Sequence, residues 1–510
     1  MKYILVIDEG TTSTRAVLFD INGREINIER EKLNVFFPEP GLVECDAVEI
    51  WEKTKEVLRR CVKNAGITDS DIVSIGMTAQ RESAIIWEKD TGKPIYNCII
   101  WQDRRTDAYC KKLNEIPDAL YKVHTKTGLL ITSFFPAVKA LWMLDNIPGA
   151  RERAERGELC FGTVDTWLFY NMTDKKRFVA EQSNAARTSL FNIHTFQWDD
   201  ELLELFQIPK TMLAPEILPS DGYFGDAIGI FDRDIPIRGS LGDQQAATLG
   251  QLCLNAGEGK ISLGTSGLMS LNIGDKPSIS LKLLSTLGWN INGNVSYHYE
   301  TGFYFCGGLL DWLKSLGFLT NPVESAEIAA SVPDTAGVKF ISCFFGLTNP
   351  EMLDSARGLI SGLTPFVGKA HIVRAALESI GFQTKDACSL INQELKEVGT
   401  HLTFKRLSTD GGVSNNDFVM QFIADMLNLD VYRNNATEST ALGAFYVSAI
   451  SSEVIEKLDD LKEYCSNTTV FSPQMDSDTR RSSYNEWKNA LNNAVLWAKN
   501  IDTQYISETD

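Results

Sequence analysis

Two similar stretches constrain the fold of this chain more than any other feature. In each, an apolar run leads through a Gly-Thr turn into a second apolar run, at residues 4–20 around Gly10 and at residues 260–271 around Gly264. This pattern is typical of two strands joined by a tight turn. Glycine lets backbone N–H groups approach an anion, and the neighbouring hydroxyls add further donors. One such turn also fits an ordinary polar hairpin, but the pair predicts a duplicated fold whose two hairpins grip phosphate together.

The chain length agrees with a duplication. At 510 residues it exceeds what a single core usually serves, so we expect two domains, divided as residues 1–250 and 251–510. The composition, 44% hydrophobic and 23% charged, is that of an ordinary globular protein. Each half then begins near one hairpin.

Charge and hydropathy indicate which kinds of partner and which location the protein has. The net charge of −18, with no basic cluster, predicts no nucleic-acid partner. The first apolar run meets Asp8 before a signal-peptide core forms, and no later apolar run approaches 18 residues. We therefore expect a cytoplasmic protein without a membrane segment.

Polar residues follow the predicted strands at several points. Asp8 ends the first strand, where it could hold a cation or its water, and a strand at residues 72–77 leads to Arg81 and Glu82. Ligands of open α/β sheets bind at the carboxyl ends of strands, so this Arg-Glu pair is a candidate site. A surface ion pair is the alternative.

Later stretches offer further candidates. Asp243 lies in or just before the first turn of a predicted helix, where it is either functional or a plain N-terminal cap. A strand ending near residue 410 runs into Gly411 and Gly412, which either admit a flat ring against the backbone or form a simple turn, with an Asn amide nearby to pair with the ring edge. Between these stretches we expect a helix-rich segment at residues 300–318.

Several longer runs point to one family. Residues 134–142 nearly fit the first signature of the FGGY carbohydrate kinases, although Ala140 stands where a larger apolar residue is usual, and residues 358–378 fit the second. Taken together, the chain resembles this family over essentially its whole length, most closely the members that phosphorylate glycerol. The runs that carry the closer resemblance are residues 40–44, 91–97, 156–167 and 184–195.

The resemblance implies a fold, an activity and cofactors. The implied fold is α/β, with two actin-like, ribonuclease H-type domains and a cleft between them. The implied activity is ATP-dependent phosphorylation of glycerol with Mg²⁺, by a homodimer or homotetramer. The chain has no G-x-x-x-x-G-K-[ST] motif, so the ordinary P-loop is excluded.

The resemblance also assigns residues. Asp243 would act as general base, and Asp8 would sit by the magnesium through water. The polyol would be surrounded by Arg81, Glu82, Trp101, Phe134, Asp243, Gln244 and Leu268. ATP would be bound by Thr11, Thr12, Ser13, Arg15, Gly264, Thr265, Gly307, Gly411 and Asn415.

Two departures leave alternatives open. Phe134 stands where glycerol-phosphorylating members usually have Tyr, and Leu268 where they have an aromatic wall. We expect weaker glycerol binding by about tenfold at most, and room for a longer acceptor. The alternatives are a kinase for another polyol or sugar, such as erythritol or a ketose, and a non-catalytic nucleotide-binding regulator. The presence of all four charged residues of the resemblance argues against the regulator: Asp8, Arg81, Glu82 and Asp243.

Overall fold

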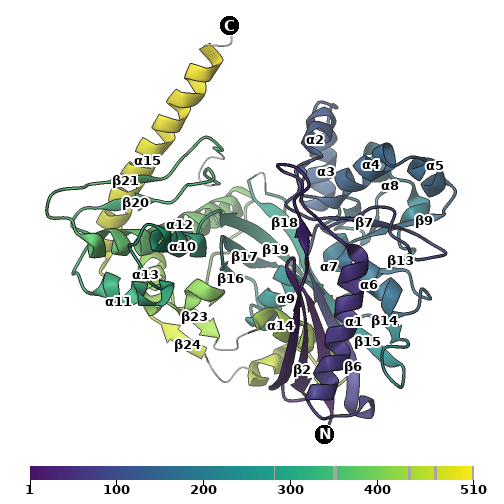
Figure 1. Cartoon of the computed structure of the whole chain (residues 1–510). Helices are drawn as coiled ribbons and strands as arrows, with labels where there is room; N and C mark the ends of the chain where they lie inside the picture. Colours follow the sequence, from purple (N-terminus) through teal and green to yellow (C-terminus); the bar gives the residue numbers. More distant parts are fainter. Residues whose placement is uncertain (281, 349–352, 435–437, 465–467, 508–510) are drawn as a thin grey trace.

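The chain forms two halves that lie side by side, each built on a mixed sheet (Figure 1). The computed structural model describes residues 1–510 except 281, 349–352, 435–437, 465–467 and 508–510. The first sheet has the order β14-β15-β6-β1-β2-β3, and the second has the order β18-β19-β17-β16-β22-β23-β24. The strands of the first are β1 (Tyr3–Glu9), β2 (Ser13–Asp20), β3 (Glu25–Lys32), β6 (Ile72–Ala79), β14 (Tyr223–Ala227) and β15 (Ile235–Gly242). Those of the second are β16 (Glu258–Leu263), β17 (Gly267–Gly274), β18 (Leu284–Ile291), β19 (Asn294–Phe303), β22 (Arg406–Asp410), β23 (Val431–Asn434) and β24 (Thr468–Phe471).

The two predicted hairpins occupy equivalent positions in the two sheets. β1 pairs antiparallel with β2 and parallel with β6, while β16 pairs antiparallel with β17 and parallel with β22. β1 is buried on both faces, which explains why it reads as a continuous apolar run rather than an alternating one. The duplication predicted from the sequence is therefore confirmed at the level of strand topology.

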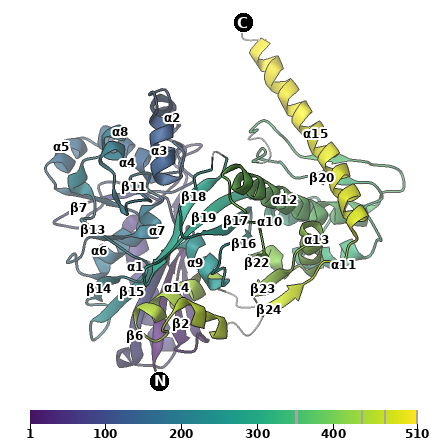
Figure 2. The same cartoon turned by 180° about the vertical axis from the view of Figure 1, so that it is seen from behind.

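Helices cover the first sheet on both faces. α1 (Ala47–Asn64) packs on β2 and β3, and the Asp46 side chain caps it by accepting from the Val48 N–H. α14 (Ser439–Ser451) packs on β1, β6 and β15, as the view from behind shows (Figure 2). A late segment of the chain thus closes the core of the first half.

The second half also reaches into the first. β18 contacts α7 (Gln182–Ala185), and Trp289 of β18 shares a buried cluster with Ile4 and Val6 of β1. α12 (Lys369–Glu397), α13 (Asp417–Leu427) and α15 (Ser477–Ser507) lie on the far side of the second sheet, where α15 projects from the body (Figure 1). The two halves are interleaved rather than joined by one linker.

The remaining elements are short, and most belong to the first half. Those up to residue 250 are β4 (Val35–Phe36), β5 (Glu44–Cys45), η1 (Asp69–Asp71), β7 (Ile85–Glu88), β8 (Cys98–Ile99), α2 (Asp107–Asn114), α3 (Ala119–Thr127), α4 (Pro136–Asn146), α5 (Ala150–Glu155), β9 (Leu159–Gly162), α6 (Val164–Met172), β10 (Val179–Glu181), β11 (Phe191–Asn192), β12 (Gln197–Trp198), α8 (Asp200–Leu205), η2 (Lys210–Met212), β13 (Glu216–Leu218) and α9 (Asp243–Gly250). Later ones are α10 (Gly307–Ser315), η3 (Pro322–Glu324), α11 (Ser325–Ala330), β20 (Lys339–Ile341), β21 (Leu359–Ser361), η4 (Gly412–Asn415) and η5 (Leu458–Tyr464).

One predicted segment differs from the structure. The expected helix-rich stretch at residues 300–318 begins with a strand, because β19 runs to Phe303 and α10 starts only at Gly307. β19 pairs with β17 on one side and β18 on the other, and its aromatic residues suit a strand between two neighbours. Across the described residues, no helix is both long enough and apolar enough to cross a membrane.

Candidate active site

The Arg-Glu pair lies just past the carboxyl end of β6, as predicted. Glu82 has a φ of 63°, in the left-handed region that non-glycine residues rarely adopt. Lys139 of α4 holds this turn, because its Nζ donates to the carbonyls of Glu82 at 2.8 Å and Phe134 at 2.5 Å. Burial lowers the pKa of Lys139 to about 7. A residue held in this rarely adopted backbone conformation is typical of a functional site.

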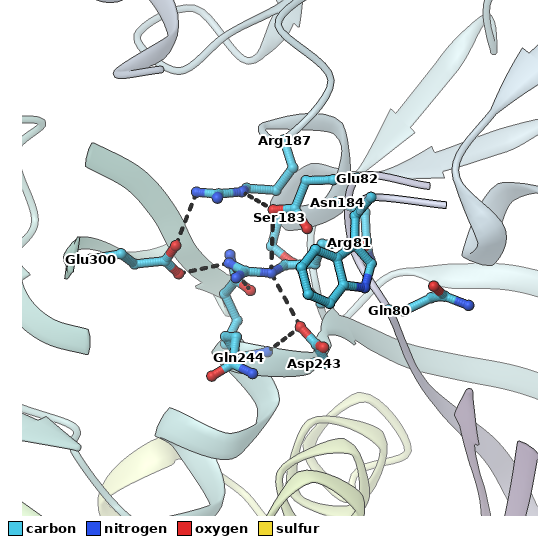
Figure 3. A network of polar contacts seen from close by, with 12 residues as sticks. Gln80, Arg81, Glu82, Ser183, Asn184, Arg187, Asp243, Gln244 and Glu300 are labelled. Carbon is cyan, nitrogen blue, oxygen red and sulfur yellow. Dashed lines mark hydrogen bonds and ion pairs between the residues drawn. The ribbon is translucent and has the colours of Figure 1, made fainter. Parts of the chain in front are cut away.

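Arg81 and Glu82 belong to a buried cluster of charges (Figure 3). Arg81 Nη1 donates to Glu300 Oε1 at 2.6 Å, and Arg187 Nε donates to Glu82 Oε1 at 2.6 Å. Arg187 Nη1 lies 3.1 Å from Glu300 Oε2, which closes the arrangement. Each of the four side chains is at most 5% exposed.

The charges of this cluster stabilise one another. Burial alone would raise the pKa of Glu300, but the guanidiniums of Arg187 and Arg81 outweigh it and lower that pKa to about 2. Burial likewise opposes the charge on Arg81, yet Glu300, Glu82 and Asp243 together raise its pKa. Glu300 and Arg81 therefore stay charged at neutral pH.

Asp243 is the accessible carboxylate beside this cluster. It is the first residue of α9, directly after β15, and its Oδ1 lies 3.1 Å from Arg81 Nε. The Gln244 N–H donates to the same oxygen at 2.7 Å. Its side chain is 34% exposed, whereas the carboxylates of Glu82 and Glu300 are buried. Burial raises the pKa of Asp243, although Arg81 opposes this. An accessible carboxylate of this kind fits a general base.

The first hairpin adjoins the same region. Asp8 and Arg15 face each other across the β1–β2 pair and form an ion pair, and Arg15 also contacts Glu438. Burial raises the pKa of Asp8 to about 6, and the charge of Asp243 adds to this, so the two carboxylates lie within electrostatic range. At the tip, Trp101 Nε1 donates to Thr11 Oγ1 at 3.0 Å. Thr12 at the tip is exposed, and Ser13 begins β2.

The second hairpin gathers the predicted glycines. The Gly307 N–H donates to the Gly264 carbonyl at 2.7 Å, and Thr265 at the tip is exposed. Gly411 has a φ of 88°, and a Cβ there would come within 2.6 Å of the Leu263 backbone. Asn415 is exposed at the end of η4, the turn that follows Gly411. These residues thus form one surface of glycines and exposed polar groups.

One face of the second sheet contacts the start of α9. Lys260 Nζ donates to Gln244 Oε1 at 2.5 Å, which joins β16 to the start of α9. Lys260 pairs with Ser270 and Ser270 with Glu300, while Leu268 pairs with Gly302, two residues from Glu300 on the same face. Leu268 therefore lies on the sheet face that carries Glu300.

Two aromatic side chains of the first half, Phe134 and Trp101, pack together near the Arg81–Glu82 pair. The Phe134 ring packs against Trp101, with ring centroids 5.6 Å apart and nearly perpendicular planes. Phe134 is half-buried, and its carbonyl is held by the same Lys139 that holds Glu82. Trp101 connects this aromatic pair to Thr11 at the first hairpin.

Sequence reasoning missed several residues of this region. Arg187 and Lys139 lie inside runs that carried the family resemblance, so their position gave a signal without a role. Glu300 was hidden by the incorrect helix expectation for its segment. Lys260 and Glu438 reach the site only through tertiary contacts, and no local pattern marks either.

Known proteins share this architecture. Of the solved structures, Plasmodium falciparum glycerol kinase with ADP superposes with a TM-score of 0.91 at 30% identity, covering 97% of this chain and 98% of that one. The ligand-bound xylulose kinase from Lactobacillus acidophilus has a TM-score of 0.84 at 21% identity, a likeness of fold alone. The predicted fold class, two actin-like domains of the ribonuclease H type, is confirmed by these neighbours.

Sequence relatives agree. Glycerol kinase 2 of Thermotoga maritima is 42% identical over 98% of this chain and 100% of its own length. Glycerol kinase of Parabacteroides distasonis is 42% identical over 98% of this chain and 99% of its own length. Models of the N-terminal and C-terminal domains of the FGGY family of carbohydrate kinases match residues 3–250 and 259–452. Two domain models match the chain, and its relatives align over their full length. The chain therefore belongs to the FGGY family of carbohydrate kinases.

Proposed function

We propose that this kinase transfers the γ-phosphoryl group of ATP to glycerol. The observation that carries the proposal is the accessible Asp243 carboxylate, 3.1 Å from Arg81 and next to the Arg81–Glu82 pair. Its full-length relatives named glycerol kinase support glycerol as the acceptor. We place the enzyme in the cytoplasm, where ATP is available. That it forms a homodimer or homotetramer stays a prediction.

The acceptor would be held by charged and aromatic groups together. Arg81 supplies donors and Glu82 an acceptor for neighbouring hydroxyls, while Trp101 covers the carbon skeleton. Gln244, held by Lys260, borders Asp243 on α9. Phe134 and Leu268 complete the apolar wall, and neither offers a polar atom of its side chain.

Phosphoryl transfer then follows from position and charge. An acceptor hydroxyl oxygen forms the new bond to the γ-phosphorus as the bond to the ADP oxygen breaks. Asp243 takes the hydroxyl proton late in this step, because a carboxylate is a much weaker base than an alkoxide. The backbone N–H groups and hydroxyls of Thr11, Thr12 and Ser13, with Gly264 and Thr265 opposite, would bind the phosphate oxygens.

Residues of both halves would bind the nucleotide. Gly307 and Gly411 would lie along the nucleoside, and the Asn415 amide would pair with the adenine edge. Arg15 would assist at the phosphates from its place beside Asp8.

The acidic residues fit a loosely held Mg²⁺. Among the described residues, no group of three or more histidine, cysteine or acidic side chains forms a metal cluster. Mg²⁺ in kinases is held mainly by phosphate oxygens and water, with one or two carboxylates. Asp8 is buried at the end of β1, where its carboxylate pairs with Arg15, and it fits such a role through water. The ion would neutralise charge on the phosphates.

A panel of acceptors tests the proposal. We expect ADP release that depends on acceptor, with the highest kcat/KM for glycerol among glycerol, erythritol, larger polyols and ketoses. A preference for another acceptor would redirect the substrate assignment, and ATP binding without turnover of any acceptor would favour a nucleotide-binding regulator.

A longer polyol is the second candidate, and one observation favours it. Leu268 stands on the face of the second sheet that carries Glu300, where a larger aromatic side chain would take up more space. The same panel decides between the two acceptors, because a larger pocket raises kcat/KM for erythritol relative to glycerol.

A further inference from the structure

Two buried residues outside the predicted site hold both members of the Arg81–Glu82 pair. Glu300 accepts from Arg81 at 2.6 Å, and Arg187 donates to Glu82 at 2.6 Å. Glu300 and Arg187 approach each other to 3.1 Å, and Arg81 Nε lies 3.6 Å from Glu82 Oε1. The four charges form a closed ring (Figure 3), which we call the buried ion ring.

The buried ion ring leaves one side of each site residue free. The shortest contacts of Arg187 and Arg81 with Glu82 are both to its Oε1, and within the described residues no hydrogen bond reaches its Oε2. The hydrogen bonds of Arg81 similarly use Nη1, and its shortest other ion pairs use Nε, so Nη2 makes no hydrogen bond within the described residues. One edge of each group is thus fixed while the other stays available to a hydroxyl.

The buried ion ring also joins the two halves. Arg187 follows α7 in the first half, whereas Glu300 belongs to β19 of the second sheet. β18, the neighbour of β19, packs against α7. The ring is therefore complete only when the second half is seated on the first.

We propose that Arg187 and Glu300 are positioning residues for the acceptor. They fix the rotamers of Arg81 and Glu82, and through Glu300 the second half sets the geometry of the acceptor site. Without the charge of Glu300, both guanidiniums would turn to Glu82 and occupy its free oxygen. The inference rests on the proposed function, because that proposal assigns Arg81 and Glu82 to the acceptor.

Glu300→Gln tests the inference, with Glu394→Gln as the matched control. Glu394 is also a buried glutamate of the second half with a basic partner, Lys282, but it lies on α12. We expect Glu300→Gln to lower kcat/KM for the acceptor at least about thirtyfold through a higher acceptor KM, with the KM for ATP within twofold. Glu394→Gln should keep both KM values within twofold, even if it lowers the Tm by as much as Glu300→Gln does.

Two further variants separate positioning from general damage. Glu300→Asp keeps the charge, so it should recover part of the lost acceptor affinity. Arg187→Lys keeps a charge but loses the guanidinium fork, and it carries the test with the same expected KM split if Glu300→Gln does not fold. The double variant Arg187→Lys/Glu300→Gln should lose less than the product of the single effects, because the residues act as a unit.

The outcomes also separate this inference from the proposed function. An active wild-type enzyme whose Glu300 and Arg187 variants keep the acceptor KM within twofold would overturn only the positioning role. Equal changes in the KM for ATP and for the acceptor would do the same. A wild-type protein that phosphorylates no acceptor would overturn both.

Discussion

Asp243 combines accessibility with a position beside buried charges. Its carboxylate lies against Arg81 and is 34% exposed, so it can reach a substrate while its orientation is fixed by the Gln244 N–H. Removing a general base typically lowers a rate by about 10²–10⁴-fold. Asp243→Asn keeps the shape and loses the base.

We expect Asp243→Asn to lower kcat by about 10³-fold while ATP affinity stays within a few fold. ADP release at saturating acceptor and calorimetric ATP titration measure the two quantities. The wild-type rate should also fall as the pH falls through the pKa of Asp243, which burial raises, because only the ionised form accepts a proton. An Asp243→Asn variant with ordinary turnover would remove this residue from its role.

A substitution at Phe134 is expected to strengthen acceptor binding rather than to weaken activity. Its ring packs on Trp101 at the proposed acceptor site and offers no hydroxyl. Phe134→Tyr adds one donor and acceptor, and one neutral hydrogen bond contributes about 0.5–1.5 kcal/mol. We therefore expect the glycerol KM to fall by up to about tenfold, with Phe134→Leu as the control that lacks a hydroxyl. An unchanged or higher KM in the tyrosine variant would contradict this interpretation.

Glu9 links burial to the pH dependence of stability. It is fully buried beside Thr54, and burial raises its pKa to about 8 from an ordinary value of 4.5. Between these two pH values the unfolded chain releases a proton that the folded chain keeps. The free energy of unfolding therefore falls as the pH rises through this window, by at most about 1.4 kcal/mol per pH unit for one group.

Glu9→Gln should remove this dependence. Because glutamine cannot ionise, the stability of the variant relative to the wild type should increase from pH 5 to pH 8 by about 1 kcal/mol or more. Chemical denaturation of both proteins at the two pH values measures it. A constant difference between them would show that Glu9 is ionised in the folded protein.

At the element scale, two helices meet closely behind the site. A Cβ on Gly443 of α14 would lie 1.8 Å from the Ala246 carbonyl of α9, and one on Gly250 would lie 2.0 Å from the Ser439 carbonyl. Backbone atoms cannot give way as a flexible side chain would, so only glycine fits here. Since α9 begins at Asp243, this crossing sets where the proposed base stands.

Gly443→Ala should therefore affect both stability and rate. We expect a loss of about 1–3 kcal/mol in the free energy of unfolding from overpacking, and a lower kcat as α9 shifts. Gly368→Ala is the control, because its Cβ would meet nothing closer than 3.8 Å. If Gly443→Ala matches the wild type in Tm and kcat, α9 and α14 are not held by this contact.

The helices, strands and turns also show how much of the structure the sequence could predict. Both hairpins, the strand before Arg81, the helix that begins at Asp243 and the turn at Gly411 have strong local patterns, and the structure contains them. Glu300 was missed because apolar and aromatic residues near it suit a helix and a strand alike, and only pairing with β17 and β18 decides. The buried ion ring depends on contacts between segments far apart in the sequence, which no local pattern reports.

On the scale of the whole molecule, the two halves share a buried core across the predicted boundary between residues 250 and 251. α14 lies after that boundary, yet it covers the first sheet: Phe445 packs on Phe19 with ring centroids 5.1 Å apart. Ser448 Oγ lies 2.9 Å from Ser74 Oγ of β6. The close approach is possible because Gly76 and Gly239 carry no Cβ at this contact.

A fragment of residues 1–250 should therefore lack a complete core. It keeps the first sheet but exposes the face that α14 covers, which includes Ile4, Val6, Val17 and Phe19. We expect the fragment to bind a hydrophobic dye and to unfold without a cooperative transition, whereas the full chain should give one calorimetric transition. Adding residues 251–510 in trans is the control, because α14 then becomes available and dye binding should fall. A monomeric fragment with cooperative unfolding and no dye binding would mean that the first half folds alone and that α14 only docks on it.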